Sequence, residues 1–473
     1  MNYILKGHNL ADDVMSMLMM FYPNDKYVLT EIPKDGITVE SRLESLNAYS
    51  VVYIDNKQVA QASVQGRDNN IKEIKRIIKL SLYNALQQVK PMKMPWGILT
   101  GVRPAKVVSA FIDEGMTRQQ TYDCLKNDYL VSDDKISLAM QVSESERQIV
   151  ENGKDKIGMY IGIPFCPTRC LYCSFTAYPL SQYAKRVDEY LDCLIKEMEF
   201  MSDYVNSNNL ESLYIGGGTP TSLNEQQLDR MLTAVDKYFN IPVEYTVEAG
   251  RPDTITRQKL QILKKHNVNR ISINPQTLND ETLKRIGRKH SVEMFKEAFN
   301  MARQEGHTHI NTDIIIGLPG EGVKELEQTM NGLRELSPES ITVHTLAVKR
   351  ASRLKETLEE YTMADYDEIE KMLELSAEYT RAMGMEPYYM YRQKNMLGNF
   401  ENVGYCKPHC QCIYNVQIME EKQTIIALGA GGSTKLYNSK TNELERIFNV
   451  KSIEDYTGRI DEMLERKAVL NKK

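Results

Sequence analysis

The sequence predicts an α/β fold built on a parallel sheet of six strands, each followed by a helix. Between about residues 158 and 383, six apolar runs alternate with helix-length amphipathic segments. This repeated β-then-α order is typical of parallel strands joined by crossover helices. The runs are nearly continuous in apolar residues, as in strands covered on both faces. Six units fit either a doubly wound sheet or an incomplete (β/α)6 barrel, and periodicity does not decide between them.

The first 152 residues have a different pattern, which predicts an N-terminal α+β domain. The stretch "YSVVYIDNKQVAQASV" indicates a β-hairpin around Asp55 and Asn56. "NNIKEIKRIIKLSLYNALQQV" has the spacing of an amphipathic helix. "WGILTGVRPAKVVSAFIDEG" predicts a glycine-containing turn and a second helix. We find no set of catalytic residues in this region.

The six strands lie in residues 153–385, which we expect to form the central domain. One helix is expected near Ser222, because Ser222-Leu223-Asn224-Glu225 has the S-x-x-E form of a capping box. Another follows Ser291, and a third covers about 364–383. The strands are expected at 159–165, 212–218, 244–250, 270–276, 310–319 and 340–348.

The remaining residues, 386–473, are turn-rich and contain an apolar run, "IIALGAGGST", and a closing helix. We expect them to form a C-terminal extension that covers the substrate. The motifs of the central domain fall at the C-terminal ends of its strands, where both candidate folds place active sites.

Composition excludes several classes of function. The chain has 473 residues, 42% hydrophobic and 26% charged, which is enough for a large core in two or three domains. A net charge of -5 gives no basic excess for nucleic acid. The N-terminus lacks the basic segment of a signal peptide, and no apolar run reaches the roughly 18 residues of a membrane span. We therefore expect a soluble cytoplasmic protein with reduced cysteines.

Three cysteines lie within eight residues in "PFCPTRCLYCSF": Cys166, Cys170 and Cys173, with the spacing C-x3-C-x2-C. Buried core thiols are one explanation, although a proline and an arginine interrupt the group. A zinc site is another, but zinc takes four ligands and no fourth Cys or His is near. A four-iron cluster normally takes four thiolates, so three would leave one iron open for a substrate or cosubstrate.

The motif, with the aromatic Tyr172 before its last cysteine, resembles the signature of the radical S-adenosylmethionine (SAM) superfamily. This resemblance implies that residues 153–385 form an incomplete (β/α)6 radical SAM barrel. It also implies that the three cysteines bind a [4Fe–4S] cluster and that SAM occupies the open iron. In that family, one electron from the cluster cleaves SAM to methionine and a 5′-deoxyadenosyl radical, which takes a hydrogen atom from the substrate. The protein orients these groups and excludes water.

A glycine run, "YIGGGTP", follows the second strand. Glycines allow a backbone to approach a ligand closely, although such turns often serve packing alone. The run resembles the SAM-binding loop of the same superfamily. That resemblance implies that SAM contacts Gly216, Gly217, Gly218 and Thr219.

Further motifs narrow the resemblance to the oxygen-independent coproporphyrinogen III oxidase (dehydrogenase) family. "VEAGRPD", "NRISINPQT", "RIGRKH" and "NTDIIIGLPG" follow in that family's order. By this resemblance Arg288 pairs with the SAM carboxylate and Asp313 accepts from the ribose hydroxyls. The same resemblance places Glu248, Gln276 and Ala347 in the SAM pocket and makes Tyr160 a candidate catalytic residue.

The sequence departs from the best-known members of this family at two positions. Phe175 stands where they have a fourth cysteine, and Gly162 stands where they have a histidine. Phenylalanine at the position of Phe175 also occurs in the haem-chaperone branch. "LTGVRPAK", "PFCPTRCLYCSFTAYP" and "MYRQKNMLGNFENVGY" resemble a third branch, the HemZ-type proteins, whose members are usually described as coproporphyrinogen dehydrogenases.

The resemblance implies oxidative decarboxylation of coproporphyrinogen III to protoporphyrinogen IX in haem biosynthesis, with an electron donor such as flavodoxin or ferredoxin. Two alternatives stay open: a haem-binding chaperone-like protein, and a radical SAM enzyme acting on another substrate, for example a methyltransferase. The substrate carries four propionates. Candidate cations for them are Lys349, Arg350, Arg353, Lys355, Arg392 and Lys394.

A second cysteine group lies in "CKPHCQC", which contains Cys406, His409, Cys410 and Cys412. Three cysteines and a histidine within seven residues could ligate a second cluster or a metal, and ordinary loop thiols are the alternative. Cys124 and Cys193 fall in helical patterns and are expected to be buried thiols.

Overall fold

A computed structural model describes the chain except for residues 24, 175–176, 349–351, 357–360, 393–399 and 471–473. The chain divides into two compact units. The smaller contains Met1–Gln141 with Arg392–Phe400, and the larger contains Val142–Tyr391 with Glu401–Lys473. Helix α5 (Asp133–Asn152) runs from one unit into the other.

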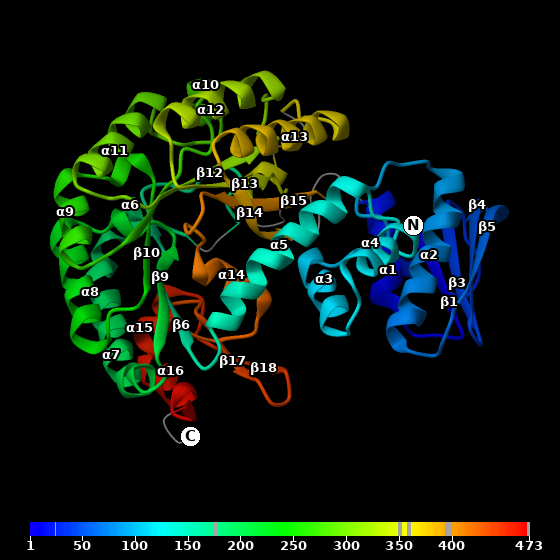
Figure 1. The fold of residues 1–473 in the computed structure, drawn as a ribbon, viewed down its shortest axis with the longest axis horizontal. Helices are drawn as coiled ribbons and strands as arrows, with labels where there is room; N and C mark the ends of the chain where they lie inside the picture. Colours follow the sequence, from blue (N-terminus) through cyan, green and yellow to red (C-terminus); the bar gives the residue numbers. More distant parts are fainter. Residues whose placement is uncertain (24, 175–176, 349–351, 357–360, 393–399, 471–473) are drawn as a thin grey trace. The chain divides into compact units, whose positions relative to one another are not determined.

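The smaller unit is built on a five-stranded sheet with the order β2-β1-β3-β4-β5 (Figure 1). The predicted hairpin is present: β4 and β5 pair in antiparallel fashion, and Asp55 and Asn56 have positive φ angles of 48° and 64°. Such angles are typical of a two-residue type I′ turn. The strands are β1 (Asn2–Lys6), β2 (Val28–Leu29), β3 (Ile37–Glu44), β4 (Asn47–Ile54) and β5 (Lys57–Gln65).

Two helices pack on this sheet and complete its core: α1 (Ala11–Phe21) and the predicted α2 (Ile71–Val89). Asn70 caps α2 by accepting a hydrogen bond from the backbone of Lys72 at 3.0 Å. The second predicted helix is α3 (Pro104–Asp113), which begins at a proline, and α4 (Arg118–Asn127) follows it. The predicted α+β organisation of this region is therefore present.

The larger unit contains an 11-stranded sheet of described residues, with the order β14-β15-β13-β12-β11-β10-β9-β6-β16-β17-β18. Its centre is the six predicted strands, which pair in parallel and in chain order. A doubly wound sheet reverses its strand order partway, so this sheet is singly wound. The six are β6 (Ile157–Ile163), β9 (Leu210–Gly217), β10 (Glu244–Gly250), β11 (Arg270–Ile273), β12 (Ile310–Ile316) and β13 (Ser340–Thr345).

Residues 386–473 extend this same sheet at both edges. Beyond β13 lie β14 (Glu386–Arg392) and β15 (Glu401–Cys406), and β15 is antiparallel to β13. At the other edge β16 (Thr424–Leu428) is parallel to β6 and leads into the β17–β18 hairpin. The hairpin strands are β17 (Ser433–Asn438) and β18 (Glu443–Phe448).

Helices α7 to α13 form an arc on the outer side of the sheet (Figure 1). The predicted capping box near Ser222 is wrong by two residues: Asn224 caps α8 and Gln227 completes the box, because Ser222 ends a short 3-10 turn. Ser291 caps α11 as predicted. The arc consists of α7 (Val187–Asn206), α8 (Glu225–Tyr238), α9 (Arg257–Lys265), α10 (Asp280–Arg285), α11 (Val292–Gln304), α12 (Val323–Leu336) and α13 (Tyr366–Ala382).

Shorter elements complete the larger unit. The predicted closing helix is two helices separated at Arg459. These and the remaining elements are α6 (Leu180–Tyr183), α14 (Ile413–Glu420), α15 (Ile453–Gly458), α16 (Ile460–Lys467) and the small parallel pair β7 (Phe165–Cys166) and β8 (Tyr178–Pro179).

Candidate radical SAM site

The cysteine loop begins where β6 ends and is fixed at its base by the neighbouring glycine loop. The backbone N–H of Gly218 donates to the carbonyl of Ile163 at 2.8 Å, and that of Thr219 donates to the carbonyl of Phe165 at 2.7 Å. Further along, the N–H of Leu171 donates to the carbonyl of Ile286 at 2.9 Å. The loop is thus held by the connection between β9 and α8 and by the C-terminal end of α10.

The three predicted cluster ligands are neighbours in this loop. Burial is the largest effect on Cys166 and, together with the nearby Cys170 and Cys173, raises the pKa of its thiol to about 11. The hydroxyl of Thr219, 3.5 Å from the sulfur of Cys166, opposes this shift. Iron must therefore displace a proton from this thiol. Among the described residues no three His, Cys, Asp or Glu side chains surround one point as a single metal ion requires. A cubane distributes its thiolates over separate irons, so three neighbouring thiols on one loop fit it.

The three glycines each have a structural reason to be glycine. A Cβ on Gly216 would lie 2.9 Å from the carboxylate of Glu248, and one on Gly218 would lie 2.5 Å from the carbonyl oxygen of Phe165. Gly217 has φ +111°, which other residues rarely adopt. The glycine loop therefore packs tightly between the cysteine loop and β10.

Glu248, on β10, is a half-buried carboxylate that faces the glycine loop. The hydroxyl of Tyr214 donates to its Oε1 at 2.6 Å. Burial is the largest effect and raises the pKa of Glu248 to about 7; nearby Asp313 adds to the shift, while the Tyr214 bond opposes it. A cationic group entering this pocket would favour the ionised carboxylate.

Gln276 and Asp313 are joined through the backbone. Gln276 lies three residues after the end of β11, and Asp313 is the central residue of β12. The N–H of Gln276 donates to the carbonyl of Asp313 at 3.0 Å, and Gln276 has a positive φ of 70°. The side chain of Asn274 accepts from the N–H of Asp313 at 3.1 Å. A polar rim therefore forms at this edge of the sheet.

The carboxylate of Asp313 is stabilised in its ionised form. Burial alone would raise its pKa, but the nearby His344 and the hydrogen bond from Asn311 outweigh this and lower the pKa. Asn311 donates to Oδ1 at 2.8 Å, and His344 Nε2 lies 3.8 Å from Oδ2. His344 also contacts the hydroxyl of Tyr391 at 3.2 Å through Nδ1. Sequence reasoning missed His344, because the sixth strand was expected to run to residue 348 and the structure ends it at Thr345, next to His344.

Arg288 is buried beside the cysteine loop. Its guanidinium donates to the carbonyl of Asn274 at 2.8 Å and to the hydroxyl of Tyr172 at 3.2 Å, while its Nε has no partner among the described residues. His290 is also buried, and burial together with Arg288 lowers its pKa to about 3. A neutral His290 leaves Arg288 as a cation suited to a carboxylate ligand.

Tyr160, the candidate catalytic residue, is a half-buried residue of β6 whose ring is stacked with those of two other tyrosines. Its ring centroid is 6.3 Å from that of Tyr214 and 6.0 Å from that of Tyr414. Burial raises the pKa of Tyr160, so its phenol stays protonated. Ala347 follows β13 and is half-buried.

Several predicted residues take no part in this arrangement. Arg392 is 5% exposed; its guanidinium stacks over Trp96 and donates to the carbonyl of Leu99, all within the smaller unit. It is therefore unavailable to a propionate. Arg353 and Lys355 are exposed after β13. Four further predicted positions lie outside the described residues: Lys349, Arg350, Lys394 and Phe175.

The second cysteine group lies at the opposite ends of the strands. Cys406 is opposite Ser340, where β13 begins, and Cys412 contacts Glu244, where β10 begins. Cys410 lies 3.7 Å from His309. All three thiols are buried in one apolar cluster, and within the described part of the chain no three His, Cys, Asp or Glu side chains are placed to hold a single metal ion. The predicted thiols Cys124 and Cys193 lie on α4 and α7 and are half-buried.

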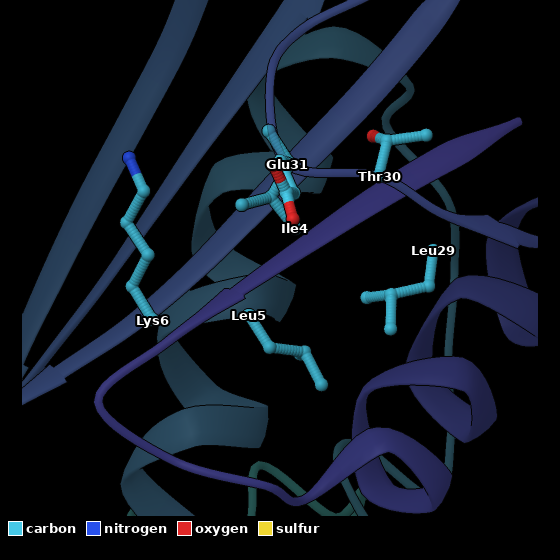
Figure 2. A pocket seen from close by; sticks show the side chains of 6 residues that line it. All are labelled: Ile4, Leu5, Lys6, Leu29, Thr30 and Glu31. Carbon is cyan, nitrogen blue, oxygen red and sulfur yellow. The ribbon is translucent and has the colours of Figure 1, made fainter.

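A separate pocket of about 460 Å³ lies in the smaller unit (Figure 2). It is lined by β1 and the segment that contains β2, and it holds none of the predicted site residues. Its lining residues are Ile4, Leu5, Lys6, Leu29, Thr30 and Glu31.

Comparison with known proteins decides the family. The profile of the Radical SAM superfamily matches residues 160–333. The chain is 42% identical over 405 residues to the oxygen-independent coproporphyrinogen-III oxidase-like protein HemZ of Bacillus subtilis, covering 84% of this chain and 81% of that protein. The chain belongs to the radical SAM superfamily. Within it the chain is a HemZ-type protein, and its cofactors are a [4Fe–4S] cluster and SAM.

Other relatives of this radical SAM protein match shorter segments. The haem chaperone HemW of Bacillus subtilis is 38% identical over 193 residues, covering 40% of this chain and 50% of that protein. The oxygen-independent coproporphyrinogen III oxidase of Salmonella typhimurium is 31% identical over 193 residues, covering 40% and 42%. The matched segment thus covers half of the first of these two relatives and less than half of the second.

A solved structure shows the same fold. The coproporphyrinogen III oxidase HemN of Escherichia coli superposes with a TM-score of 0.55 at 21% identity, covering 68% of this chain and 73% of that one. In the part of the chain that the structure describes, no helix is both long and apolar enough to cross a membrane.

Proposed function

We propose that this radical SAM protein catalyses the oxygen-independent oxidative decarboxylation of coproporphyrinogen III to protoporphyrinogen IX in haem biosynthesis. The observation that carries the proposal is the 42% identity to a protein described as an oxygen-independent coproporphyrinogen-III oxidase-like protein, over 84% of the chain. The match to HemN supports the fold, which we take to be an incomplete (β/α)6 barrel with its site at the C-terminal ends of the strands.

In this proposal the residues at those strand ends hold the two cofactors. Cys166, Cys170 and Cys173 would bind three irons of the cluster and leave the fourth to the amino and carboxylate groups of SAM. The remaining SAM contacts would come from Gly216, Gly217, Gly218, Thr219, Glu248, Gln276, Arg288, Asp313 and Ala347.

The charges of these residues suit the charges of the ligand. The hydrogen-bond partner of Glu248 among the described side chains is the neutral phenol of Tyr214. The ionised carboxylate would therefore face the cationic part of SAM. Arg288 has no carboxylate among its hydrogen-bond partners here and would pair with the carboxylate of SAM. Asp313, whose pKa is lowered, would accept hydrogen bonds from the ribose diol.

Bound SAM would supply the radical that removes a hydrogen atom from the substrate. Each of two propionates would then lose CO2 and one electron and become a vinyl group, so an external electron acceptor is needed. The chain itself would orient the substrate, and the exposed Arg353 and Lys355 are candidates for binding propionates. We take the reductant to be a flavodoxin or ferredoxin and the compartment to be the cytoplasm.

A second candidate function is haem binding or transfer. Over segments of 193 residues, the identity to a haem chaperone is 38%, whereas that to a coproporphyrinogen III oxidase is 31%. Phe175, at the position where the best-known oxidases have a cysteine, points the same way.

Anaerobic reconstitution separates the two functions. The reconstituted protein is given SAM, reductant, an electron acceptor and coproporphyrinogen III, and protoporphyrin and 5′-deoxyadenosine are measured. We expect both products, and neither from the Cys173→Ala variant; Cys410→Ala, at the opposite ends of the strands, should behave as wild type. SAM cleavage without protoporphyrin would indicate another substrate. Haem binding without SAM cleavage would indicate a haem carrier.

A further inference from the structure

Arg251 is a buried arginine that joins the cysteine loop to the end of β10. It follows β10 directly and is 3% exposed. Its Nη1 donates both to the carbonyl of Thr168 at 3.1 Å and to the hydroxyl of Thr168 at 2.7 Å. Thr168 stands two residues from Cys166 and two from Cys170. The guanidinium therefore holds the loop between two cluster ligands.

The other side of the same guanidinium is paired with a carboxylate. Nε and Nη2 of Arg251 donate to the two oxygens of Asp253 at 2.9 and 2.7 Å, which is a bidentate ion pair. The side chain of Asp253 is 13% exposed. The pair as a whole is neutral, so removal of either member would leave an uncompensated charge beside the loop.

Arg251 cannot follow the loop, because its own backbone is fixed. The hydroxyl of Thr254 donates to the carbonyl of Arg251 at 2.7 Å and lies 2.7 Å from the hydroxyl of Thr221. The buried amine of Lys259 donates to the carbonyls of Thr221 at 2.8 Å and Thr254 at 3.1 Å. Polar contacts thus run without a break from α9, through the loops after β9 and β10, to the cysteine loop.

The charge of Arg251 lies close to the ligands. Its guanidinium contacts Thr168 at 2.7 and 3.1 Å, and Thr168 lies between Cys166 and Cys170 in the same loop. The reduction potential of an iron–sulfur cluster depends on nearby charge, on hydrogen bonds and on solvent exposure. A cation at this place favours the reduced cluster, and an anion favours the oxidised one.

We propose that Arg251 is a positioning residue for the [4Fe–4S] cluster: it fixes the cysteine loop through Thr168, and its ion pair with Asp253 sets the potential of the cluster. The inference concerns the cluster alone and requires no particular substrate. Its failure is therefore distinguishable from failure of the proposed decarboxylation.

The test is a redox titration of the reconstituted full-length protein, followed by electron paramagnetic resonance, with iron counted per chain. Arg251→Gln leaves Asp253 unpaired and should move the midpoint potential to more negative values. Asp253→Asn leaves Arg251 unpaired and should move it to more positive values. The double variant should return towards wild type. The control is Arg257→Gln, which removes an exposed arginine at the start of α9 that pairs with Glu305 at the end of α11, and it should change nothing.

Arg251→Lys separates charge from position, because lysine keeps the charge but lacks the planar fork. It should keep a potential near wild type and lose iron several-fold faster on exposure to a chelator. If Arg251→Gln fails to fold, the proposal is tested by two other measurements: the change in midpoint potential of Asp253→Asn and the rate of iron loss from Arg251→Lys. Unchanged potentials and iron retention in all variants, or shifts of one sign in both single variants, would overturn the proposal.

Discussion

At the scale of single residues, a buried arginine and a half-buried carboxylate lie in the site without forming an ion pair with each other. Arg288 donates to a carbonyl and a phenol, and Glu248 accepts from a phenol. Buried charges are normally paired, so unpaired ones mark a site at which a ligand completes the pairing. A zwitterionic ligand with an added positive charge, such as SAM, offers both partners.

Glu248 makes the stability of the protein depend on pH in a predictable direction. Its pKa in the folded protein, about 7, is above its ordinary value of 4.5. The folded state therefore binds more protons than the unfolded state between these values, and the free energy of unfolding falls as pH rises through that range. This single group contributes a loss of up to about 3 kcal/mol.

We expect the Glu248→Gln variant to lack this loss. Urea unfolding of the cofactor-free protein between pH 5 and pH 8 measures it, and the quantity of interest is the wild-type free energy minus that of the variant. That difference should decrease as the pH rises, since other titrating groups contribute equally to both proteins. Parallel pH profiles would show that the Glu248 carboxyl titrates normally.

At the scale of elements, the sequence predicted the order of strands and helices but not the pairing of strands. Each apolar run stands next to its own helix, so β6, β9, β10, β11, β12 and β13 were all expected. Pairing depends on contacts between runs, and periodicity within a run carries no information about them. For the same reason the sequence did not predict that β14 and β15 would extend the sheet beyond β13, or that β16 would pair with β6.

The candidate site shows the same division. The cysteine and glycine motifs were visible because their residues are close in sequence and their types are unusual. Arg251 was visible only as part of "VEAGRPD", because its partner Thr168 lies 83 residues away. Arg392 failed as a propionate ligand for a related reason: its partners Trp96 and Leu99 are almost 300 residues distant in the chain.

The close contact between the glycine loop and the cysteine loop yields a second prediction. A Cβ on Gly218 would lie 2.5 Å from the carbonyl oxygen of Phe165 and 2.9 Å from that of Ile163. These are backbone atoms, so the loops must separate. We expect Gly218→Ala to destabilise the protein by about 2 kcal/mol or more and to lower iron retention.

Thermal unfolding and iron content check this prediction. Gly458→Ala, at the end of α15, is the matched control, since a Cβ there meets nothing within 4 Å and alanine favours a helix. A Gly218→Ala protein as stable as wild type and fully loaded with iron would show that the two loops can part without cost.

At the scale of the whole larger unit, the C-terminal helices are joined to the strand that carries the cysteine loop. Tyr190 of α7 donates to the carbonyl of Gly162 in β6 at 2.6 Å and accepts from the N–H of Ala430 at 3.0 Å. Glu197, about two helical turns after Tyr190 in α7, accepts hydrogen bonds from the N–H of Gly429 at 2.8 Å and from the hydroxyl of Tyr456 at 2.6 Å. Elements far apart in sequence therefore share one buried polar network.

Lys467 completes this network and supplies the last prediction. It and Glu197 are both fully buried and form an ion pair, and Lys467 also donates to the carbonyl of Ala427 at 2.7 Å. Lys467→Met would leave a buried carboxylate without its cation, which costs about 3–5 kcal/mol. The Glu197→Gln/Lys467→Met double variant should recover much of this loss, because neither charge then remains.

The same two helices offer a solvent-exposed control. Lys196 of α7 pairs with Asp461 of α16 at 2.6 Å, with side chains that are 50% and 79% exposed. Lys196→Met should cost no more than about 1 kcal/mol, because water screens an exposed pair. Urea unfolding of the four proteins measures the contrast. If Lys467→Met and Lys196→Met cost the same, the C-terminal helices are held by apolar packing alone. If Lys467→Met is several-fold more costly, the buried ion pair fixes the C-terminal helices against α7 and, through Tyr190, supports β6 beneath the cysteine loop.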